Sequence, residues 1–273
     1  MRVCLMIEGQ EGVTWDQWRA LATTAEQSGF EALFRSDHYE SLSGPPNRGS
    51  LDAWGTINAL AALTSTIKLG TLVSPATFRH PSTLARSAVT ADHVSQGRIE
   101  LGMGAGWHEG EHRSFGFPFE TTRDRFDRLT EQVEIVSRSW DAEPFDFDGR
   151  YYRLENANAQ PKPTNRPNLI LGGSAGPRGA ALAARWADEY NTVYPTLEEA
   201  RERKARIDAA CAEAGRDPIT FSAMIPLDGS PDQLVERLRG LADAGVERVM
   251  LQHLAHEDLA TVELVGREVI PAV

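Results

Sequence analysis

The chain of 273 residues carries 28 basic and 39 acidic side chains, a formal charge of −11, and 41% of its residues are hydrophobic. This composition excludes a disordered or collagenous chain, and the negative charge disfavours a nucleic-acid partner. Two separated cysteines and the lack of a long apolar run predict a cytoplasmic protein with no membrane partner and no cysteine-bound metal. The length fits either two average domains or one large barrel.

Short apolar runs alternate with longer segments of helical periodicity along the chain. The runs predicted to be strands are, in chain order, Val3–Ile7, Phe30–Arg35, Ile67–Val73, Arg98–Met103, Asn168–Leu171, Glu189–Val193, Ile219–Met224 and Glu247–Leu251. The segments predicted to be helices are Trp15–Ser28, Asp52–Leu63, Pro81–Val94, Arg123–Trp140, one following Pro177, Leu197–Ala214, Pro231–Ala244 and Asp258–Val269. Before the fifth strand, Phe145–Leu154 alternates around Asp148-Gly149 and predicts an inserted β-hairpin.

Eight strand–helix units without a linker predict an α/β fold, a (β/α)8 TIM barrel that forms one domain over residues 1–273, with a short insertion before strand five. A two-domain Rossmann-type protein is the alternative. In a barrel, the residues that carry chemistry lie in the loops after the strands. Position in the sequence therefore predicts which residues can share a site.

The residues that follow the predicted strands are polar or glycine: Glu8-Gly9-Gln10, Ser36-Asp37-His38, Ser74-Pro75, Gly104-Ala105-Gly106-Trp107-His108 and Gly172-Gly173-Ser174. Glycine lets backbone N–H groups approach an anion, although it can also simply end a strand. The turn at 102–107 lacks the last glycine of the dinucleotide fingerprint. Gly172-Gly173-Ser174, with Arg178 at the start of a helix, predicts a phosphate site, and a plain turn is the alternative.

Asp37-His38 is the polar pair best suited to acid–base chemistry. A carboxylate can orient an imidazole, and histidine exchanges protons near neutral pH. The alternative is a loop pair that caps a helix. Because neighbouring residues on a strand point to opposite faces, only one of the two needs to face a pocket.

The segment His108-Glu109-Gly110-Glu111-His112 matches the HExxH pattern of zinc hydrolases, in which two histidines bind the metal and the glutamate activates water. Its context is poor for a long helix, because glycines precede it, Gly110 interrupts it and Gly116 follows it. Later histidines, His253 and His256, are possible supplementary ligands. Zinc hydrolysis is therefore a distant alternative, and we expect no bound metal.

The whole set of motifs resembles the bacterial luciferase-like family, and within it the flavin- and F420-dependent oxidoreductases. The resemblance is strong over residues 1–195 and weaker in the last third. The motifs that carry it are Glu8-Gly9-Gln10-Glu11-Gly12 with Trp15, Phe34-Arg35-Ser36-Asp37-His38, Leu51-Asp52-Ala53-Trp54, Ile67–Pro75, Phe78-Arg79-His80-Pro81, Gly97–Gly102, Gly104–Trp107 through Glu111-His112, and Leu171-Gly172-Gly173.

The resemblance implies a barrel with an insertion at Phe145–Pro167 and a flavin or deazaflavin ring at the carboxyl end of the strands. It further implies a bulge with a non-proline cis peptide bond, Leu72–Val73, that supports the ring. The residues expected to contact the cofactor are Asp37, His38, Leu72, Val73, Ser74, Gly104, Ala105, Gly106, Trp107, Gly172, Gly173, Ser174 and Arg178. Arg35 and Arg79 are further candidates for binding phosphate.

One departure from the family concerns the proton donor. Sugar-phosphate dehydrogenases of the family place an acidic residue in the turn after strand four, where this chain has Trp107. The proton donor of those enzymes therefore cannot be assigned to a residue of this chain by resemblance. The possible acids are Glu8, His108 and Glu111. We therefore expect His38, Glu8 and Glu111 to be the catalytic residues.

These inferences predict a cytoplasmic, homodimeric oxidoreductase that transfers hydride between coenzyme F420 and a small organic substrate. An FMN-dependent monooxygenase on the same fold is the closest alternative. A member that binds its cofactor without turnover is a third possibility, because a fold does not guarantee activity.

Overall fold

The computed structural model describes residues 1–42, 44–45, 47–141 and 143–273. Within these residues, eight parallel strands close into a barrel in the order β1-β10-β9-β8-β7-β4-β3-β2. The strands are β1 (Arg2–Ile7), β2 (Ala32–Arg35), β3 (Lys68–Pro75), β4 (Ile99–Gly104), β7 (Asn168–Gly172), β8 (Glu189–Val193), β9 (Thr220–Pro226) and β10 (Arg248–His253). The closed barrel confirms the predicted fold class and contradicts the Rossmann-type alternative, whose sheet is open.

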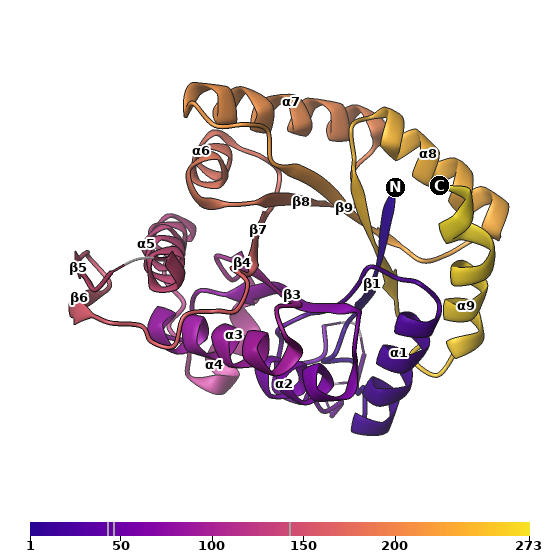
Figure 1. Ribbon diagram of the computed structural model, residues 1–273, viewed down its shortest axis with the longest axis horizontal. Helices are drawn as coiled ribbons and strands as arrows, with labels where there is room; N and C mark the ends of the chain where they lie inside the picture. Colours follow the sequence, from indigo (N-terminus) through magenta and orange to yellow (C-terminus); the bar gives the residue numbers. More distant parts are fainter. Residues whose placement is uncertain (43, 46, 142) are drawn as a thin grey trace.

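Helices surround the barrel, and the amino and carboxyl termini lie near each other beside α8 and α9 (Figure 1). The helices are α1 (Trp15–Gln27), α2 (Ala53–Leu63), α3 (Pro81–Ser95), α4 (Glu109–Phe115), α5 (Thr122–Asp141), α6 (Pro177–Trp186), α7 (Leu197–Glu213), α8 (Pro231–Asp243) and α9 (Leu259–Leu264). A π-helical turn, Val265–Val269, and a 3-10 turn, Ile270–Ala272, continue α9.

The short helix α4 is an addition to the helices predicted from sequence. His108 caps its first turn through a hydrogen bond from the backbone N–H of Glu111. Gly116 ends it with a φ of 71°, a left-handed conformation that glycine adopts without a steric penalty. The local glycines therefore limit the helix to seven residues rather than prevent it.

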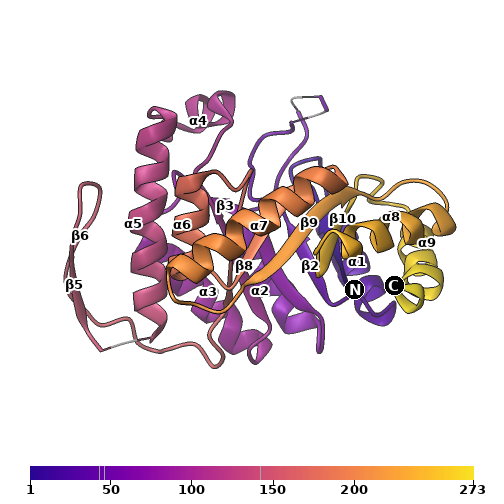
Figure 2. The same cartoon turned by 90° about the horizontal axis from the view of Figure 1, so that it is seen from above.

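The predicted hairpin is formed by β5 (Phe145–Asp148) and β6 (Arg153–Ala157) and lies outside α5, on the far side from the barrel (Figures 1 and 2). Its turn covers four residues, 149–152, instead of centring on Asp148-Gly149. The cause is Glu131 of α5, whose carboxylate accepts hydrogen bonds from the backbone N–H groups of residues 150, 151 and 152. The hairpin is thus tied to α5.

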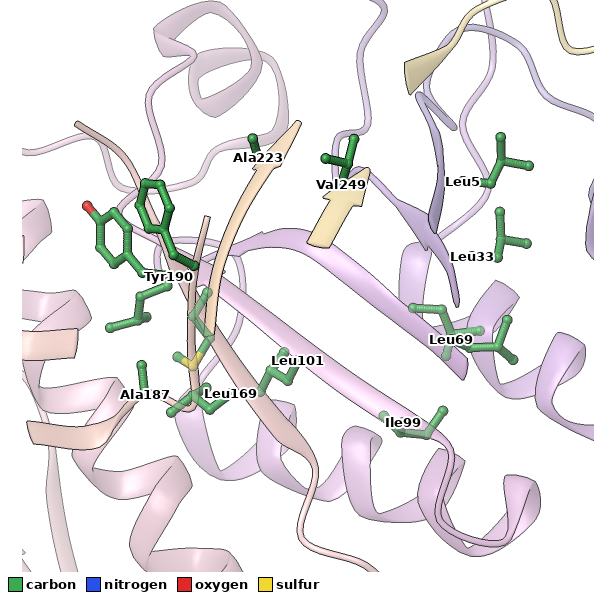
Figure 3. Close-up of a cluster of buried hydrophobic side chains, with 14 of the residues drawn as sticks. Leu5, Leu33, Leu69, Ile99, Leu101, Leu169, Ala187, Tyr190, Ala223 and Val249 are labelled. Atoms are coloured by element: carbon green, nitrogen blue, oxygen red, sulfur yellow. The ribbon is translucent and has the colours of Figure 1, made fainter. Parts of the chain in front are cut away.

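Buried apolar side chains form two sets on opposite faces of the strands. One set joins strand residues such as Leu5, Leu33 and Val249 to the inner faces of the helices (Figure 3). The other set is made of strand residues: Cys4, Met6, Ala32, Phe34, Leu72, Ile170, Met224 and Met250. Because side chains alternate along a strand, this second set fills the barrel interior.

A charged cluster occupies the amino-terminal end of the barrel interior. Arg248 lies 2.6 Å from Glu100, 2.8 Å from Glu189 and 2.8 Å from Glu31, nitrogen to oxygen, and its side chain is 1% exposed. Burial raises the pKa of Glu189 above its usual value, although Arg248 acts in the opposite direction. Lys68 also lies 2.9 Å from Glu31 and 3.4 Å from Glu100, so two cations share the three carboxylates, and Arg248 is the one that reaches Glu189.

Both cysteines are fully buried, and burial raises the pKa of the Cys4 thiol to about 12. Because the thiolate is the reactive species, we expect neither thiol of the native protein to react with Ellman's reagent within minutes at pH 8. Two thiols per chain should react after unfolding in urea, which is the control. A fast-reacting thiol in the native protein would contradict the buried positions.

Candidate active site

A cavity of about 450 Å3 opens at the carboxyl ends of the barrel strands. Its walls come from the ends of β1, β2, β3, β4, β7, β8, β9 and β10. The residues that line it are Glu8, Ser36, His38, Leu42, Leu72, Val73, Pro75, Gly106, Trp107, Gly172, Gly173, Asn191, Val193, Tyr194, Met224 and Gln252. The α4 segment and the loop after β2 rise from this same end of the barrel (Figure 2).

Eight of the residues predicted from sequence line the cavity: Glu8, His38, Leu72, Val73, Gly106, Trp107, Gly172 and Gly173. The other predicted residues are outside this lining: Asp37, Ser74, Gly104, Ala105, Glu111, Ser174 and Arg178. The cavity residues that sequence reasoning missed are Leu42, Asn191, Val193, Tyr194, Met224 and Gln252. Most of these lie in the later parts of β8, β9 or β10, and Tyr194 directly follows β8, so the rule that barrel sites lie at the carboxyl ends of strands could have found them.

His38 is held against the cavity by Glu111 of α4. The Nδ1 atom of His38 lies 2.7 Å from Oε2 of Glu111, whose side chain is fully buried. The other carboxylate oxygen accepts hydrogen bonds from the backbone N–H groups of Tyr39 and Glu40. This arrangement places the proton of neutral His38 on Nδ1 and leaves Nε2 free of a hydrogen-bond partner among the described residues.

The electrostatics of this pair keep the carboxylate charged. Burial raises the pKa of Glu111, but hydrogen bonds from His38 and from the two backbone N–H groups outweigh it and hold the pKa below its usual value. Glu111 is therefore a fixed negative charge behind the imidazole. It stabilises an imidazolium when Nε2 takes up a proton, and it does not itself contact the cavity.

Asp37 points away from the cavity. Its buried carboxylate accepts hydrogen bonds from Ser74 and Arg79, and Arg79 also binds Asp52. Arg35 is buried too and donates to the backbone oxygen of Ser36 and to other groups of the barrel wall. Both arginines suggested as phosphate ligands are thus engaged in holding the loop after β2.

At the ends of β1 and β10, the cavity wall is formed by side chains that are hydrogen-bonded to one another. The side-chain amide of Gln252 donates to one oxygen of Glu8 at 2.6 Å, and that of Gln10 donates to the other oxygen at 2.9 Å. The Tyr194 hydroxyl donates to the side-chain amide oxygen of Gln252. Burial and the nearby Glu8 carboxylate raise the pKa of Tyr194 above its usual value. At neutral pH this wall therefore presents a phenol and an acceptor-only carboxylate.

The Gly172-Gly173-Ser174 turn leads into α6, whose N-terminus has no side-chain cap. Two N–H groups of the turn are used internally, since Gly173 donates to Asn191 and Ala175 donates to Tyr190. The guanidinium of Arg178 binds Asp127. The uncapped first turn of α6 is consequently the part of this segment best able to bind an anion, and the role of Arg178 stays a prediction.

The HExxH residues do not converge on a common point. His112 lies 2.6 Å from the Thr77 hydroxyl through Nε2 and 2.7 Å from the backbone oxygen of His108 through Nδ1. Glu109 is exposed and pairs with Arg113. In the part of the chain that the structure describes, no three His, Cys, Asp or Glu side chains form a group suited to a metal ion. This geometry gives the zinc alternative no support.

The family model described as luciferase-like monooxygenase matches residues 2–227. The chain belongs to this family. An F420-dependent hydroxymycolic acid dehydrogenase of Mycobacterium tuberculosis is 32% identical to it over 208 residues, 76% of this chain and 56% of that enzyme, so the match spans little more than half of the relative. An F420-dependent glucose-6-phosphate dehydrogenase of Nakamurella multipartita is 28% identical over 92% of this chain and 90% of that enzyme.

Solved structures agree with this family membership. An F420-dependent secondary alcohol dehydrogenase, in complex with an F420–acetone adduct, superposes with a TM-score of 0.87 over 100% of this chain and 98% of that chain. Its 19% identity makes this a likeness of fold. The luciferase-like relatives also include an FMNH2-dependent monooxygenase.

The bulge expected for a luciferase-like chain is present in β3. The pairing of β3 with β4 shifts register between Thr71 and Ser74, and the Leu72–Val73 peptide bond is cis. A side chain at Gly102 would place its Cβ 2.3 Å from the Thr71 backbone oxygen, and one at Gly104 would lie 2.6 Å from Val73. These two glycines therefore make room for the bulge, whereas for Gly104 the sequence predicted the close approach of a ligand.

Trp107 replaces the acidic residue of the family's sugar-phosphate dehydrogenases at the mouth of the cavity. Its ring is 63% exposed and lies edge-on to His38, with centroids 5.9 Å apart. The turn after β4 thus supplies an apolar surface beside the imidazole. Of the possible acids, His108 is used as the cap of α4, and Glu111 faces Nδ1 of His38.

Proposed function

We propose that this luciferase-like chain is an F420-dependent oxidoreductase that transfers hydride to or from a small organic substrate. The observation that carries the proposal is the His38–Glu111 pair, which presents Nε2 of an oriented imidazole to a cavity at the carboxyl ends of the barrel strands. The F420-dependent dehydrogenases among the relatives support the choice of cofactor. No helix among the described residues is long and apolar enough to cross a membrane.

The residues present fit a deazaflavin. Leu72, Val73 and Met224 form an apolar wall suited to a flat ring, and the glycines at 172 and 173 leave space beside it. The uncapped N-terminus of α6 follows this turn and offers backbone N–H groups for the cofactor phosphate. Asp37, Ser74, Gly104, Ala105 and Ser174 are kept in the proposal as supports of this wall, and Arg178, at the start of α6, is kept as a ligand of the cofactor phosphate.

When bound, F420 supplies the two-electron hydride chemistry. His38 exchanges the proton: in alcohol oxidation, Nε2 accepts the hydroxyl proton while Glu111 stabilises the resulting charge. In the reverse direction the imidazolium donates that proton to the carbonyl oxygen. Glu8, whose two oxygens accept hydrogen bonds from two amide groups, also lines the cavity and is better placed to select substrates than to donate a proton.

Titration with each cofactor tests the proposal. We expect the purified protein to change the fluorescence of F420 saturably, and to bind FMN at least about tenfold more weakly, a difference of 1.4 kcal/mol. Tight FMN binding with no response to F420 would favour the FMN-dependent monooxygenase instead, which the monooxygenase relative supports.

The proposal also includes a homodimer in the cytoplasm, as expected from the sequence. Sedimentation of the pure protein would test the dimer. Binding of F420 without turnover of any alcohol or ketone would support the third possibility, a cofactor-binding member of the family.

A further inference from the structure

The cavity lining contains a carboxylate but no lysine or arginine among the described residues. Among the described residues that line it, the ionisable side chains are Glu8, His38 and Tyr194, and none is lysine or arginine. Arginines of the surrounding loops are paired elsewhere: Arg79 with two aspartates and Arg178 with another. A phosphate or carboxylate on the substrate would therefore enter without a cationic partner.

Glu8 places a carboxylate in the wall. Both of its oxygens accept hydrogen bonds from amide N–H groups, one of Gln252 and one of Gln10. An anionic substrate in the cavity would meet this carboxylate, and like charges brought together in an interface cost several kcal/mol. An uncharged substrate would avoid that cost and could accept or donate hydrogen bonds to Tyr194.

The mouth of the cavity is apolar. Trp107, Val193 and Tyr194 line it and are 63%, 45% and 49% exposed, and Leu42 lies on the same wall. Exposed apolar side chains gathered at one site mark a surface that binds an apolar ligand. These side chains fit the hydrocarbon body of a substrate whose oxygen faces His38.

We propose that the substrate is an uncharged alcohol or ketone with an apolar body, and that Glu8 is the residue that rejects anionic substrates. The inference rests on the proposed function. In the oxidative direction, the carbinol carbon loses its hydrogen with the bonding electron pair to oxidised F420, and the hydroxyl proton goes to Nε2 of His38. The carbon–oxygen double bond forms, so one ketone and one reduced cofactor are produced.

A matched pair of substrates tests the charge rule. Methyl 4-hydroxycyclohexanecarboxylate is neutral, and the free acid of the same ring is an anion at pH 7. With the F420-loaded enzyme, we expect kcat/KM for the ester to exceed that for the acid by on the order of 100-fold. Use of the acid within threefold of the ester would overturn the proposed substrate class.

The variant Glu8→Gln assigns the discrimination to one residue. Rotation of the Gln252 amide lets its oxygen accept from the new amide and its N–H group donate to the Tyr194 oxygen, so the wall keeps its hydrogen bonds. We expect the ester-to-acid ratio to fall at least tenfold in this variant. Glu257→Gln makes the same charge change in the loop after β10, outside the cavity lining, and should leave the ratio unchanged. An unchanged ratio in Glu8→Gln would overturn the role of Glu8.

A binding measurement separates this inference from the proposed function. Ligand-detected NMR on the cofactor-free protein, with the corresponding keto ester and keto acid, reads charge selection without turnover. Preferential binding of the keto ester supports the substrate class even if F420 fails to bind. Failure of F420 to bind would overturn the proposed function but not the substrate class. Equal or stronger binding of the keto acid overturns the substrate class even if F420 binds.

Discussion

Replacing Glu111 by glutamine is expected to lower turnover by about 10²–10⁴-fold while leaving F420 affinity within about threefold of the parent. One oxygen of Glu111 is fixed by the backbone N–H groups of Tyr39 and Glu40, so the amide oxygen of the variant must stay there. The amide N–H would then face Nδ1 of His38 and donate to it. Neutral His38 would be forced to carry its proton on Nε2, where it can no longer act as a base.

Steady-state kinetics and cofactor titration together test this role. Nitrogen NMR of labelled histidine would report the tautomer directly. Parental turnover in Glu111→Gln would show that His38 needs no carboxylate partner.

Glu109→Gln is the matched control on the same helix. Glu109 is exposed and pairs only with Arg113 among the described residues, so its loss should change turnover by less than about twofold. The same variant also tests the zinc alternative, in which Glu109 would activate water and its replacement would abolish activity. Loss of turnover in Glu111→Gln but not in Glu109→Gln would therefore support the role of His38. The reverse result would support zinc hydrolysis.

The barrel could be predicted from sequence because each of its units carries a strong local signal. Apolar runs and helical periodicity fix where strands and helices lie, and glycine or proline marks many of the ends. The turn of the β5–β6 hairpin could not be predicted, since it depends on Glu131, a residue of α5 that lies outside the hairpin. Contacts of this kind are absent from any local pattern.

The residues of the site also differ in how well the sequence predicts them. His38 follows β2, and Leu72 and Gly172 lie near the ends of β3 and β7, all within recognisable motifs. Tyr194 belongs to none of these motifs, and Gln252 comes from the last third of the chain, where the resemblance to the family is weak. The pairing of His38 with Glu111 joins residues 73 positions apart, so their contact depends on the closed barrel. Sequence reasoning named both residues as catalytic candidates but could not show that one positions the other.

Replacing Arg248 by methionine is expected to lower the free energy of unfolding at pH 7 by about 3–5 kcal/mol. The change leaves the buried Glu189 without a cation and leaves Glu100 with Lys68, 3.4 Å away. Glu100 and Glu189 are each 2.6–2.8 Å from the guanidinium and are almost fully buried. Once Arg248 is lost, the carboxylates must either remain charged in a medium of low dielectric or take up protons. Both alternatives disfavour the native state at neutral pH.

The sign of the pH dependence follows from proton uptake. Burial already raises the pKa of Glu189 in the parent, and loss of Arg248 raises it further. At pH values between the pKa of Glu189 in the unfolded chain and its raised pKa in the native variant, the native variant binds more protons than the unfolded chain does. The contribution of Glu189 to the stability of the variant must therefore increase as the pH falls from 7 to about 5, and the deficit relative to the parent must shrink.

Urea unfolding followed by tryptophan fluorescence at pH 7 and pH 5 would measure both effects. Arg206→Met on α7 is the control, because Arg206 is 54% exposed and pairs with an exposed Glu202, and it should cost less than about 1 kcal/mol. A deficit in Arg248→Met as small as the control's, or one that grows on acidification, would contradict the view that Arg248 stabilises this cluster. A large deficit that shrinks with acid would instead show that the barrel depends on a charge buried at the end opposite its active site.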